Sequence, residues 1–156
     1  MLKEMDVNIE TINSFYSAFS KLDAGGMNAR YSNDIVFSDP VFGMLEGEEV
    51  KTMWKMLCKN AVSFNLEYGN ITDKGDGYYT CDWTASYKFA ATGNRVVNKV
   101  RAYMQLENGL IIGHSDAFRF YKWARQAFGI RGWLLGWTTF FQRRVRARVR
   151  KMVANA

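Results

Sequence analysis

The spacing of apolar residues changes once along this chain, and that change constrains the fold more than any other feature. Up to about residue 61 the apolar residues recur every three or four positions, which is typical of helices. From Val62 onward they alternate with polar residues, as in strands that bury one face. The clearest alternating run covers residues 79–89. Helices followed by a series of strands predict an α+β protein.

Turn signals divide the alternating region into four strands. They lie at residues 73–77, 92–94 and 108–109, and each contains glycine next to Asp, Asn or Thr. Three hairpins that join four long strands predict an antiparallel meander with one apolar and one polar face. The last strand is expected over about residues 110–120. On the third, the residues expected on the apolar face are Val96, Val100, Ala102, Met104 and Leu106.

Three helices are expected before the meander, at about residues 8–22, 27–31 and 48–60. Asp6 or Asn8 would cap the first, and a short strand at residues 35–37 would precede the third. The first and third helices each carry one apolar stripe, which we expect to pack on the apolar face of the sheet. The stripe residues are Ile9, Ile12, Phe15, Tyr16, Phe19 and Leu22 in the first helix, and Val50, Met53, Trp54, Leu57 and Ala61 in the third.

Beyond Trp123 the pattern is helical again and is interrupted by glycines. Near the end, Trp137, Phe141, Val145 and Val149 recur every fourth residue with arginines between them, which predicts an amphipathic basic helix. We therefore divide the chain into a domain at residues 1–123 and a helical extension at residues 124–156, packed on the same domain.

Composition narrows the classes of protein and of site. With 156 residues, of which 48% are hydrophobic and 15% aromatic, the chain can bury a core. Its two cysteines and single histidine have no metal-ligand spacing, so no metal site is expected, and both thiols are expected to be buried and reduced. No apolar run has the ~20 residues that span a bilayer, and the first ten residues lack the apolar segment of a signal peptide. These features predict a cytoplasmic protein.

The net charge of +6 is concentrated near the C-terminus. Nine residues hold six positive charges and no acid, and the rest of the chain is balanced, with 15 basic and 15 acidic residues. Nucleic acid is not expected as a partner, because no base-reading module is present and the aromatics lie on the apolar stripe. The helix is expected to pack on the body or on a second subunit; the alternative is an anionic membrane surface. The charges are Arg143, Arg144, Arg146, Arg148, Arg150 and Lys151.

One candidate site lies in residues 37–43, which hold the only proline of the chain directly after an acid. Proline disfavours a helical conformation in the preceding residue, so Asp39 is expected at the end of a strand where the chain turns. Two interpretations remain open. The carboxylate of Asp39 can be solvated and form the turn, or it can be a base whose pKa an apolar pocket raises, suited to taking a proton next to a carbonyl.

A second candidate site lies in residues 112–116 of the last predicted strand. His114 and Asp116 are two residues apart and so share a face with Ile112 and Phe118, which are expected to point into the core. Because unpaired buried polar groups are costly, the two should bond each other, water or a ligand. They form either a satisfied core pair or an acid–base pair in which Asp116 orients the imidazole and His114 carries the proton.

The order of the elements and these residues resemble the nuclear transport factor two-like superfamily, which includes ketosteroid isomerases and SnoaL-like polyketide cyclases. The resemblance covers about residues 8–121. It rests on a first helix with Tyr16, a strand that ends in Asp39-Pro40-Val41, a third helix and the meander. It implies a conical α+β roll, in which the N-terminal helices pack on a curved antiparallel four-stranded meander. The basic extension has no counterpart in the small isomerases of this superfamily.

By this resemblance, Asp39 corresponds to the general base of the ketosteroid isomerases, which also precedes Pro-Val. Tyr16 corresponds to the tyrosine that donates to the developing oxyanion. The third partner in that family, a protonated aspartic acid, falls on Ala102, so half of the oxyanion site is missing, which counts against steroid isomerisation. His114 and Asp116 instead resemble SnoaL-like members in which the last strand supplies an acid or a base.

Two functions of different classes fit the sequence. The first is a cofactor-independent isomerase, cyclase or hydrolase that uses Asp39, His114, Asp116 and Tyr16 for acid–base chemistry on a small apolar carbonyl or epoxide ligand. The second is a non-catalytic ligand-binding or dimerisation module of the same fold. Neither implies a metal or an organic cofactor, and both agree with a homodimer. The residues expected to line the ligand are Trp54, Phe37, Phe42, Tyr103 and Phe118.

Overall fold

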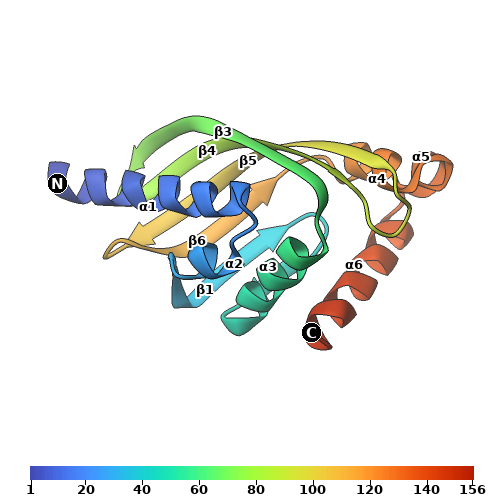
Figure 1. Ribbon diagram of the computed structural model, residues 1–156, viewed down its shortest axis with the longest axis horizontal. Helices are drawn as coiled ribbons and strands as arrows, with labels where there is room; N and C mark the ends of the chain where they lie inside the picture. The colour runs from blue at the N-terminus through green and yellow to red at the C-terminus, as the bar shows by residue number, and fades with distance from the viewer.

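A computed structural model describes all residues 1–156 and confirms the α+β architecture. Three N-terminal helices lie against one side of a curved sheet, and three C-terminal helices gather at one end of it (Figure 1). The elements are α1 (Leu2–Ser20), α2 (Ala24–Asn28), β1 (Tyr31–Asp39), β2 (Gly43–Glu46), α3 (Glu48–Asn60), β3 (Val62–Gly75), β4 (Tyr78–Lys88), β5 (Arg95–Glu107), β6 (Leu110–Ala117), α4 (Phe120–Phe128), α5 (Ile130–Leu135) and α6 (Thr139–Ala154).

The sheet has six strands in the order β2-β1-β6-β5-β4-β3. The predicted meander forms β3 to β6, and the predicted buried faces of β4 and β5 are confirmed. The sequence indicated only a short strand before α3, whereas β1 is nine residues long, forms a hairpin with β2 and pairs in parallel with β6. This parallel pairing places Phe37 next to His114 and Ser38 next to Ser115, so it joins the two candidate site segments.

The predicted helix boundaries need correction in the first third of the chain. Helix α1 begins at Leu2, with no side-chain cap, so Asp6 and Asn8 lie inside it. The second helix was expected at residues 27–31 but covers 24–28, because the carboxylate of Asp23 accepts a hydrogen bond from the Gly26 N–H and caps it. Tyr31 is therefore free to begin β1, where its side chain enters the core. The third helix begins and ends where predicted.

The last strand is shorter than predicted. It ends at Ala117, and Phe120 already belongs to α4. The register between β5 and β6 shifts near Leu106, so Ile111 fills the core position that alternation assigned to Ile112. His114 and Asp116 keep their predicted inward orientation because they lie beyond this shift.

The final helix packs on the body of the protein through the stripe Phe141, Val145, Val149 and Val153. Trp137 was predicted to belong to this stripe, but it precedes the helix and is 72% exposed. Polar contacts add to the packing: the side chains of Gln142 and Arg146 donate to the Pro40 carbonyl, at 3.1 and 3.0 Å. Helix α6 thus lies over the Asp39-Pro40 turn. None of the helices combines the length and the apolarity needed to cross a membrane.

Candidate functional site

His114 and Asp116 bond each other inside the fold. His114 Nε2 lies 2.9 Å from Asp116 Oδ1, and the two residues are only 3% and 4% exposed. The Trp83 indole N–H, on β4, donates to the same carboxylate oxygen at 3.3 Å. Of the three partners that the sequence left open for this pair, the structure therefore shows the residues bonding each other.

The other imidazole nitrogen bonds Tyr31, a residue that the sequence analysis did not single out. The Tyr31 hydroxyl lies 2.7 Å from His114 Nδ1, and the Trp54 indole N–H donates to that hydroxyl at 3.0 Å. Five side chains from α3, β1, β4 and β6 thus form one buried chain of hydrogen bonds. We call it the interior polar chain: Trp54, Tyr31, His114, Asp116 and Trp83.

The donors at the two ends determine where the protons lie in this chain. An indole nitrogen can only donate, so Trp54 uses the oxygen of Tyr31 as an acceptor. With the hydroxyl proton of Tyr31 directed to Nδ1 of His114, the tautomer that fits these bonds carries its N–H on Nε2 and donates to Asp116.

Aromatic rings enclose the imidazole. The ring centroids of Phe15, Phe37 and Trp54 lie 5.6, 5.1 and 6.4 Å from that of His114. Since both ring nitrogens are engaged, His114 in this arrangement offers no free lone pair to a ligand. The interior polar chain links helix α3 to strands β1, β4 and β6. The imidazole would take part in chemistry only through a rearrangement of these bonds.

Asp39 combines features of both interpretations left open by the sequence. Its Oδ1 accepts hydrogen bonds from the backbone N–H groups of Val41 and Phe42, at 2.9 and 2.6 Å, so it does form the turn. Its carboxylate is nevertheless not freely solvated. Burial raises the pKa of Asp39 from 3.8 to about 7, against the opposing effect of the Phe42 N–H, and the charge of Asp116 raises it further. Oδ2 accepts no hydrogen bond from the protein.

Tyr16 is fully buried on α1, and its hydroxyl has no hydrogen-bond partner. Its ring stacks on Tyr68 with centroids 5.2 Å apart. Burial, and next the charge of Asp116, raise the pKa of Tyr16 well above its ordinary value, so the hydroxyl keeps its proton. An unpaired buried donor is uncommon and costs roughly 1–3 kcal/mol. Arg146 Nε is a second buried donor without a partner, and the guanidinium of Arg146 lowers the pKa of Asp39.

Three of the five residues predicted to line a ligand lie in the core, namely Trp54, Phe37 and Phe42. Tyr103 does not. It is 50% exposed on the outer face of β5, because its neighbours Ala102 and Met104 point inward and side chains alternate along a strand. Phe118 also lies elsewhere: it follows the end of β6, is half-buried and borders a surface hollow of about 230 Å³ with Lys99, Arg119 and Lys122 among its lining residues.

A larger hollow, of about 830 Å³, lies between α3 and α6. Four cationic side chains border it, Lys55, Lys59, Arg148 and Lys151. Neither of these two hollows is lined by a residue of the interior polar chain, by Asp39 or by Tyr16. No group of three or more His, Cys, Asp or Glu side chains is placed to hold a metal ion. Cys58 and Cys81 are buried free thiols whose pKa values burial raises to about 11.

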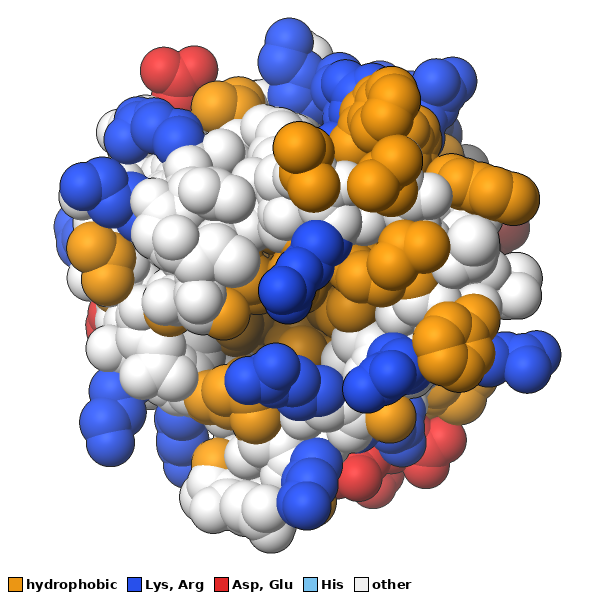
Figure 2. Space-filling view, turned by 90° about the vertical axis from the view of Figure 1, so that its right-hand side faces the viewer, with side chains coloured by type: hydrophobic (Ala, Val, Ile, Leu, Met, Phe, Trp, Pro, Cys, Tyr) orange, Lys and Arg blue, Asp and Glu red, His pale blue; other side chains and the backbone are white.

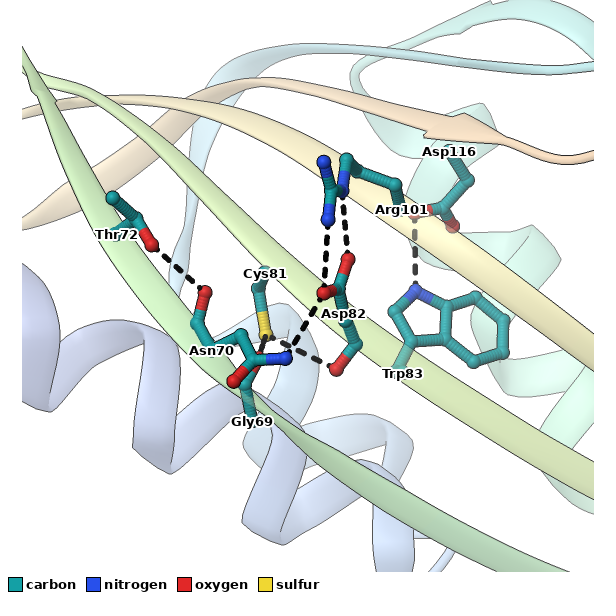
Figure 3. A network of polar contacts seen from close by, with 8 residues as sticks. All are labelled: Gly69, Asn70, Thr72, Cys81, Asp82, Trp83, Arg101 and Asp116. Atoms are coloured by element: carbon teal, nitrogen blue, oxygen red, sulfur yellow. Dashed lines mark hydrogen bonds and ion pairs between the residues drawn. The ribbon is translucent and has the colours of Figure 1, made fainter.

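The outer face of the sheet carries a different polar network (Figure 3). Arg101 contacts both carboxylate oxygens of Asp82, at 2.7 and 3.0 Å, and Asn70 donates to the same carboxylate. These hydrogen bonds lower the pKa of Asp82. One residue further along β4, Trp83 points to the opposite side and reaches Asp116 (Figure 3). Two adjacent residues of β4 therefore lie in different networks: Asp82 in an exposed ion pair and Trp83 in the buried interior.

The sequence analysis missed Tyr31 and assigned no polar partner to Trp83. Tyr31 was assigned to a helix end, where no alternation pattern marked it as inward-facing. The parity of β4 did place Trp83 on the buried face, and a buried indole N–H needs an acceptor. That requirement was a usable signal for pairing Trp83 with an inward carboxylate on a neighbouring strand.

Comparison with known proteins agrees with this geometry. A family model described as the SnoaL-like domain matches residues 12–114. No curated protein matches the chain in sequence. Among solved structures, an NTF2-like protein of unknown function from Burkholderia pseudomallei is 18% identical, with a TM-score of 0.66 over 78% of this chain and 97% of that one.

Two further structures have a similar fold. A protein with a ketosteroid isomerase-like fold from Catenulispora acidiphila, solved in complex with trimethylamine, is 9% identical, with a TM-score of 0.67 over 76% of this chain and 92% of that one. An LEH-like epoxide hydrolase from M. tuberculosis is 18% identical, with a TM-score of 0.66 over 83% and 93%. At these identities the similarity shows a common fold and nothing about activity.

Proposed function

The chain belongs to the SnoaL-like domain family, and we propose that it is an acid–base enzyme of this family that acts on a small apolar ligand with a carbonyl group. Asp39 is the proposed base. The observation that carries the proposal is the half-used carboxylate of Asp39: one oxygen is fixed by two backbone N–H groups, and the other accepts nothing from the protein. A carboxylate held in this way is oriented, and Oδ2 keeps its capacity to take a proton.

The pKa of Asp39 supports this role. A base works best when its pKa is near the working pH, and burial raises that of Asp39 to about 7. Asp82, on the outer face of the same sheet, has its pKa lowered instead by hydrogen bonds from Arg101. A surface carboxylate of that kind is a weaker base than Asp39.

In the proposed reaction, Asp39 Oδ2 takes a proton from the carbon next to the carbonyl, and the electron pair moves onto the carbonyl oxygen. The protonated carboxyl then returns the proton to another carbon of the conjugated system, so the ligand is isomerised without net gain or loss of protons. Tyr16 is the proposed donor to the oxygen that gains charge, because its buried hydroxyl is protonated and has no other acceptor. The proposal gives His114 no direct contact with the substrate.

Proton exchange at carbon tests the base without knowledge of the natural substrate. A β,γ-unsaturated cyclic ketone and a β-keto ester, incubated with the protein in D₂O, should lose their α-protons faster than in buffer, as followed by proton NMR. Asp39→Asn should abolish the increase, because the amide keeps the turn but has no basic oxygen. Tyr16→Phe should reduce it about 10–1000-fold, by loss of one oxyanion donor.

Asp82→Asn is the matched control, since it neutralises a carboxylate on the outer face of the sheet. It should leave the exchange rate unchanged. Circular dichroism of each variant must show that the fold is intact. Exchange that persists at the wild-type rate in folded Asp39→Asn would remove Asp39 from the role of base.

A non-catalytic ligand-binding protein is the second candidate. The engagement of both ring nitrogens of His114 favours it, because a catalytic histidine normally keeps one nitrogen free for the substrate. This function predicts that ligands protect the protein against thermal unfolding while their α-protons do not exchange. It also predicts equal ligand affinity for wild type and Asp39→Asn.

A further inference from the structure

Residues 130–140 expose six large apolar side chains within eleven positions, more densely than any other part of the chain. They include both exposed tryptophans, Trp133 at 57% and Trp137 at 72%, whereas Trp54, Trp83 and Trp123 are buried. We call these residues the α5 apolar face: Ile130, Trp133, Leu134, Leu135, Trp137 and Phe140. Contiguous exposed apolar residues of this kind mark a surface that contacts something else.

The protein holds this face in place by close backbone packing. Gly132 on α5 lies so near α4 that a Cβ at this position would collide with the carbonyl oxygen of Ala124. The Tyr121 hydroxyl donates to the Trp133 carbonyl at 3.1 Å, and the Trp137 indole donates to the Leu134 carbonyl at 3.0 Å. Because α5 presses its glycine side against α4, its large side chains point outward. Their exposure follows from the packing of the helices.

The charge around the face is of one sign. Residues 117–156 contain ten Lys and Arg residues and no Asp or Glu. Residues 1–116 contain eleven Lys and Arg residues and fifteen Asp and Glu residues. The guanidinium of Arg144 lies over the Phe140 ring, 5.7 Å from its centroid, and Arg131 and Arg143 are exposed in the same segment. On the side of the molecule that carries α4 to α6, hydrophobic and basic side chains are intermixed, and acidic ones lie only toward the margins of the view (Figure 2).

The structure also shows which arginines are free to contact a partner and which are bonded within the protein. Arg146 and Arg150 donate to backbone carbonyls at residues 40–44, so they fasten α6 to the β1–β2 hairpin. The sequence analysis counted both among the charges that could meet a membrane. The charges beside the apolar face are instead Arg131, Arg143 and Arg144.

We propose that the α5 apolar face docks the protein on the surface of an anionic lipid bilayer. Tryptophan side chains favour the boundary between lipid headgroups and hydrocarbon, where the ring is in an apolar layer and the N–H remains near water. Exposed arginines next to such rings meet the phosphates of anionic headgroups. The uniform positive charge of residues 117–156 complements such a surface, and it would oppose the pairing of this face with that of a second copy. The inference is independent of the proposed reaction.

Flotation of the full-length chain with lipid vesicles tests this docking. Wild type should bind vesicles of phosphatidylcholine mixed with phosphatidylglycerol at least tenfold more tightly than vesicles of phosphatidylcholine alone. Trp133→Ser/Trp137→Ser should lose at least tenfold in binding, through loss of the inserted rings. Arg143→Gln/Arg144→Gln should bind the anionic vesicles about 30-fold more weakly, because the variant lacks two positive charges that the anionic surface attracts.

Tyr78→Ser/Tyr103→Ser is the matched control, because these two aromatics are each 50% exposed on the sheet. This variant should bind vesicles like the wild type. Tryptophan fluorescence gives a second readout. Trp133 and Trp137 are the exposed tryptophans, so binding should shift the emission to shorter wavelength, and brominated lipid should quench it. The serine variant must keep the wild-type unfolding midpoint, as expected for substitutions of exposed residues.

Three results would overturn the proposal. The first is equal binding of wild type to neutral and anionic vesicles. The second is anionic binding that the tryptophan variant retains in full. The third is a wild-type dimer, seen by sedimentation velocity without lipid, that the tryptophan variant converts to a monomer while wild type binds no vesicles. That last result would assign the face to a second copy of the chain.

Discussion

In most proteins polar side chains are exposed and apolar ones are buried. The interior of the cone and the α5 apolar face both depart from this rule. The interior buries polar side chains, with His114 and Asp116 among them, and the face exposes apolar ones. Along the interior polar chain both indole N–H groups, the Tyr31 hydroxyl and both nitrogens of His114 have a partner within the protein. On the face the large side chains have no cover from the rest of the chain.

The comparison shows which unusual features point beyond the folded monomer. A buried polar group that is fully bonded contributes to a specific packing arrangement and needs no ligand. A buried donor without an acceptor, such as the Tyr16 hydroxyl, and an exposed cluster of aromatics both carry a cost that folding alone does not offset. The unsatisfied groups are therefore the stronger indicators of function. His114, whose two ring nitrogens are both bonded, is a weaker one.

The largest expected effect is on stability, and it tests whether the interior polar chain is structural. Asp116→Ala should destabilise the protein by about 2–6 kcal/mol, because it leaves two buried donors, His114 Nε2–H and the Trp83 N–H, without an acceptor. Urea denaturation measures the change. Asp82→Ala removes an exposed carboxylate from the same sheet and should cost less than about 1 kcal/mol. Similar losses in the two variants would contradict the distinction between the buried chain and the surface pair.

A second prediction concerns the pH dependence of stability at Asp39. In the unfolded chain its carboxyl titrates near 3.8, and in the folded protein the pKa is about 7. Between these values the folded state binds more protons than the unfolded state, so stability from this group falls as pH rises. Asp39→Asn removes that dependence. The variant should exceed wild type in unfolding free energy by about 2–4 kcal/mol at pH 8, and the gap should close near pH 4.

Chemical denaturation of both proteins across this pH range measures the effect, and the other titrating groups cancel in the difference between them. In the Asp39→Asn variant the amide oxygen can still accept from the N–H groups of residues 41 and 42, so the turn should persist. A constant difference at every pH would mean that the carboxylate is solvated, and that the turn is its only role.

The smallest predicted effect distinguishes a satisfied from an unsatisfied tyrosine. Tyr16→Phe should stabilise the protein by about 1 kcal/mol, because it deletes a buried hydroxyl that has no partner. Tyr31→Phe should destabilise it by about 1–3 kcal/mol, since it leaves His114 Nδ1 and the Trp54 N–H unpaired. Thermal unfolding of the two variants in parallel compares them. If Tyr16→Phe were the more damaging change, its hydroxyl would have a partner that the structure does not contain.

Part of this site was accessible from sequence. The strand parity that placed His114 and Asp116 on the inner face held, and of the three partners left open for them the structure shows the two residues bonding each other. The position of Asp39 at the end of a strand, where the chain turns, followed from the proline after it. Their partners did not follow, because Tyr31, Trp54 and Trp83 come from elements 23 to 83 residues distant from the atoms they bond.

Tyr103 and Trp137 were misplaced for related reasons. Tyr103 stands out as an aromatic, but the parity of β5 sends it to the outer face. Trp137 fits the four-residue spacing of α6, but the helix begins only at Thr139, capped by the Thr138 side chain. A residue at the end of a periodic apolar pattern belongs to the helix only if the helix extends that far.

The sequence by itself determined the order of the elements other than β2, the inward faces of α1, α3 and the meander, and the concentration of positive charge near the C-terminus. These are local properties, set by the period of apolar residues and by turn and capping residues. The tertiary structure decided which polar groups are satisfied, since the parallel pairing of β1 with β6 brings Tyr31 and Phe37 to His114. It also decided that Arg146 and Arg150 fasten α6 to the body while Trp133 and Trp137 stay outside. Hydrogen bonding and exposure depend on neighbours that are distant in sequence, and only the folded chain brings those neighbours together.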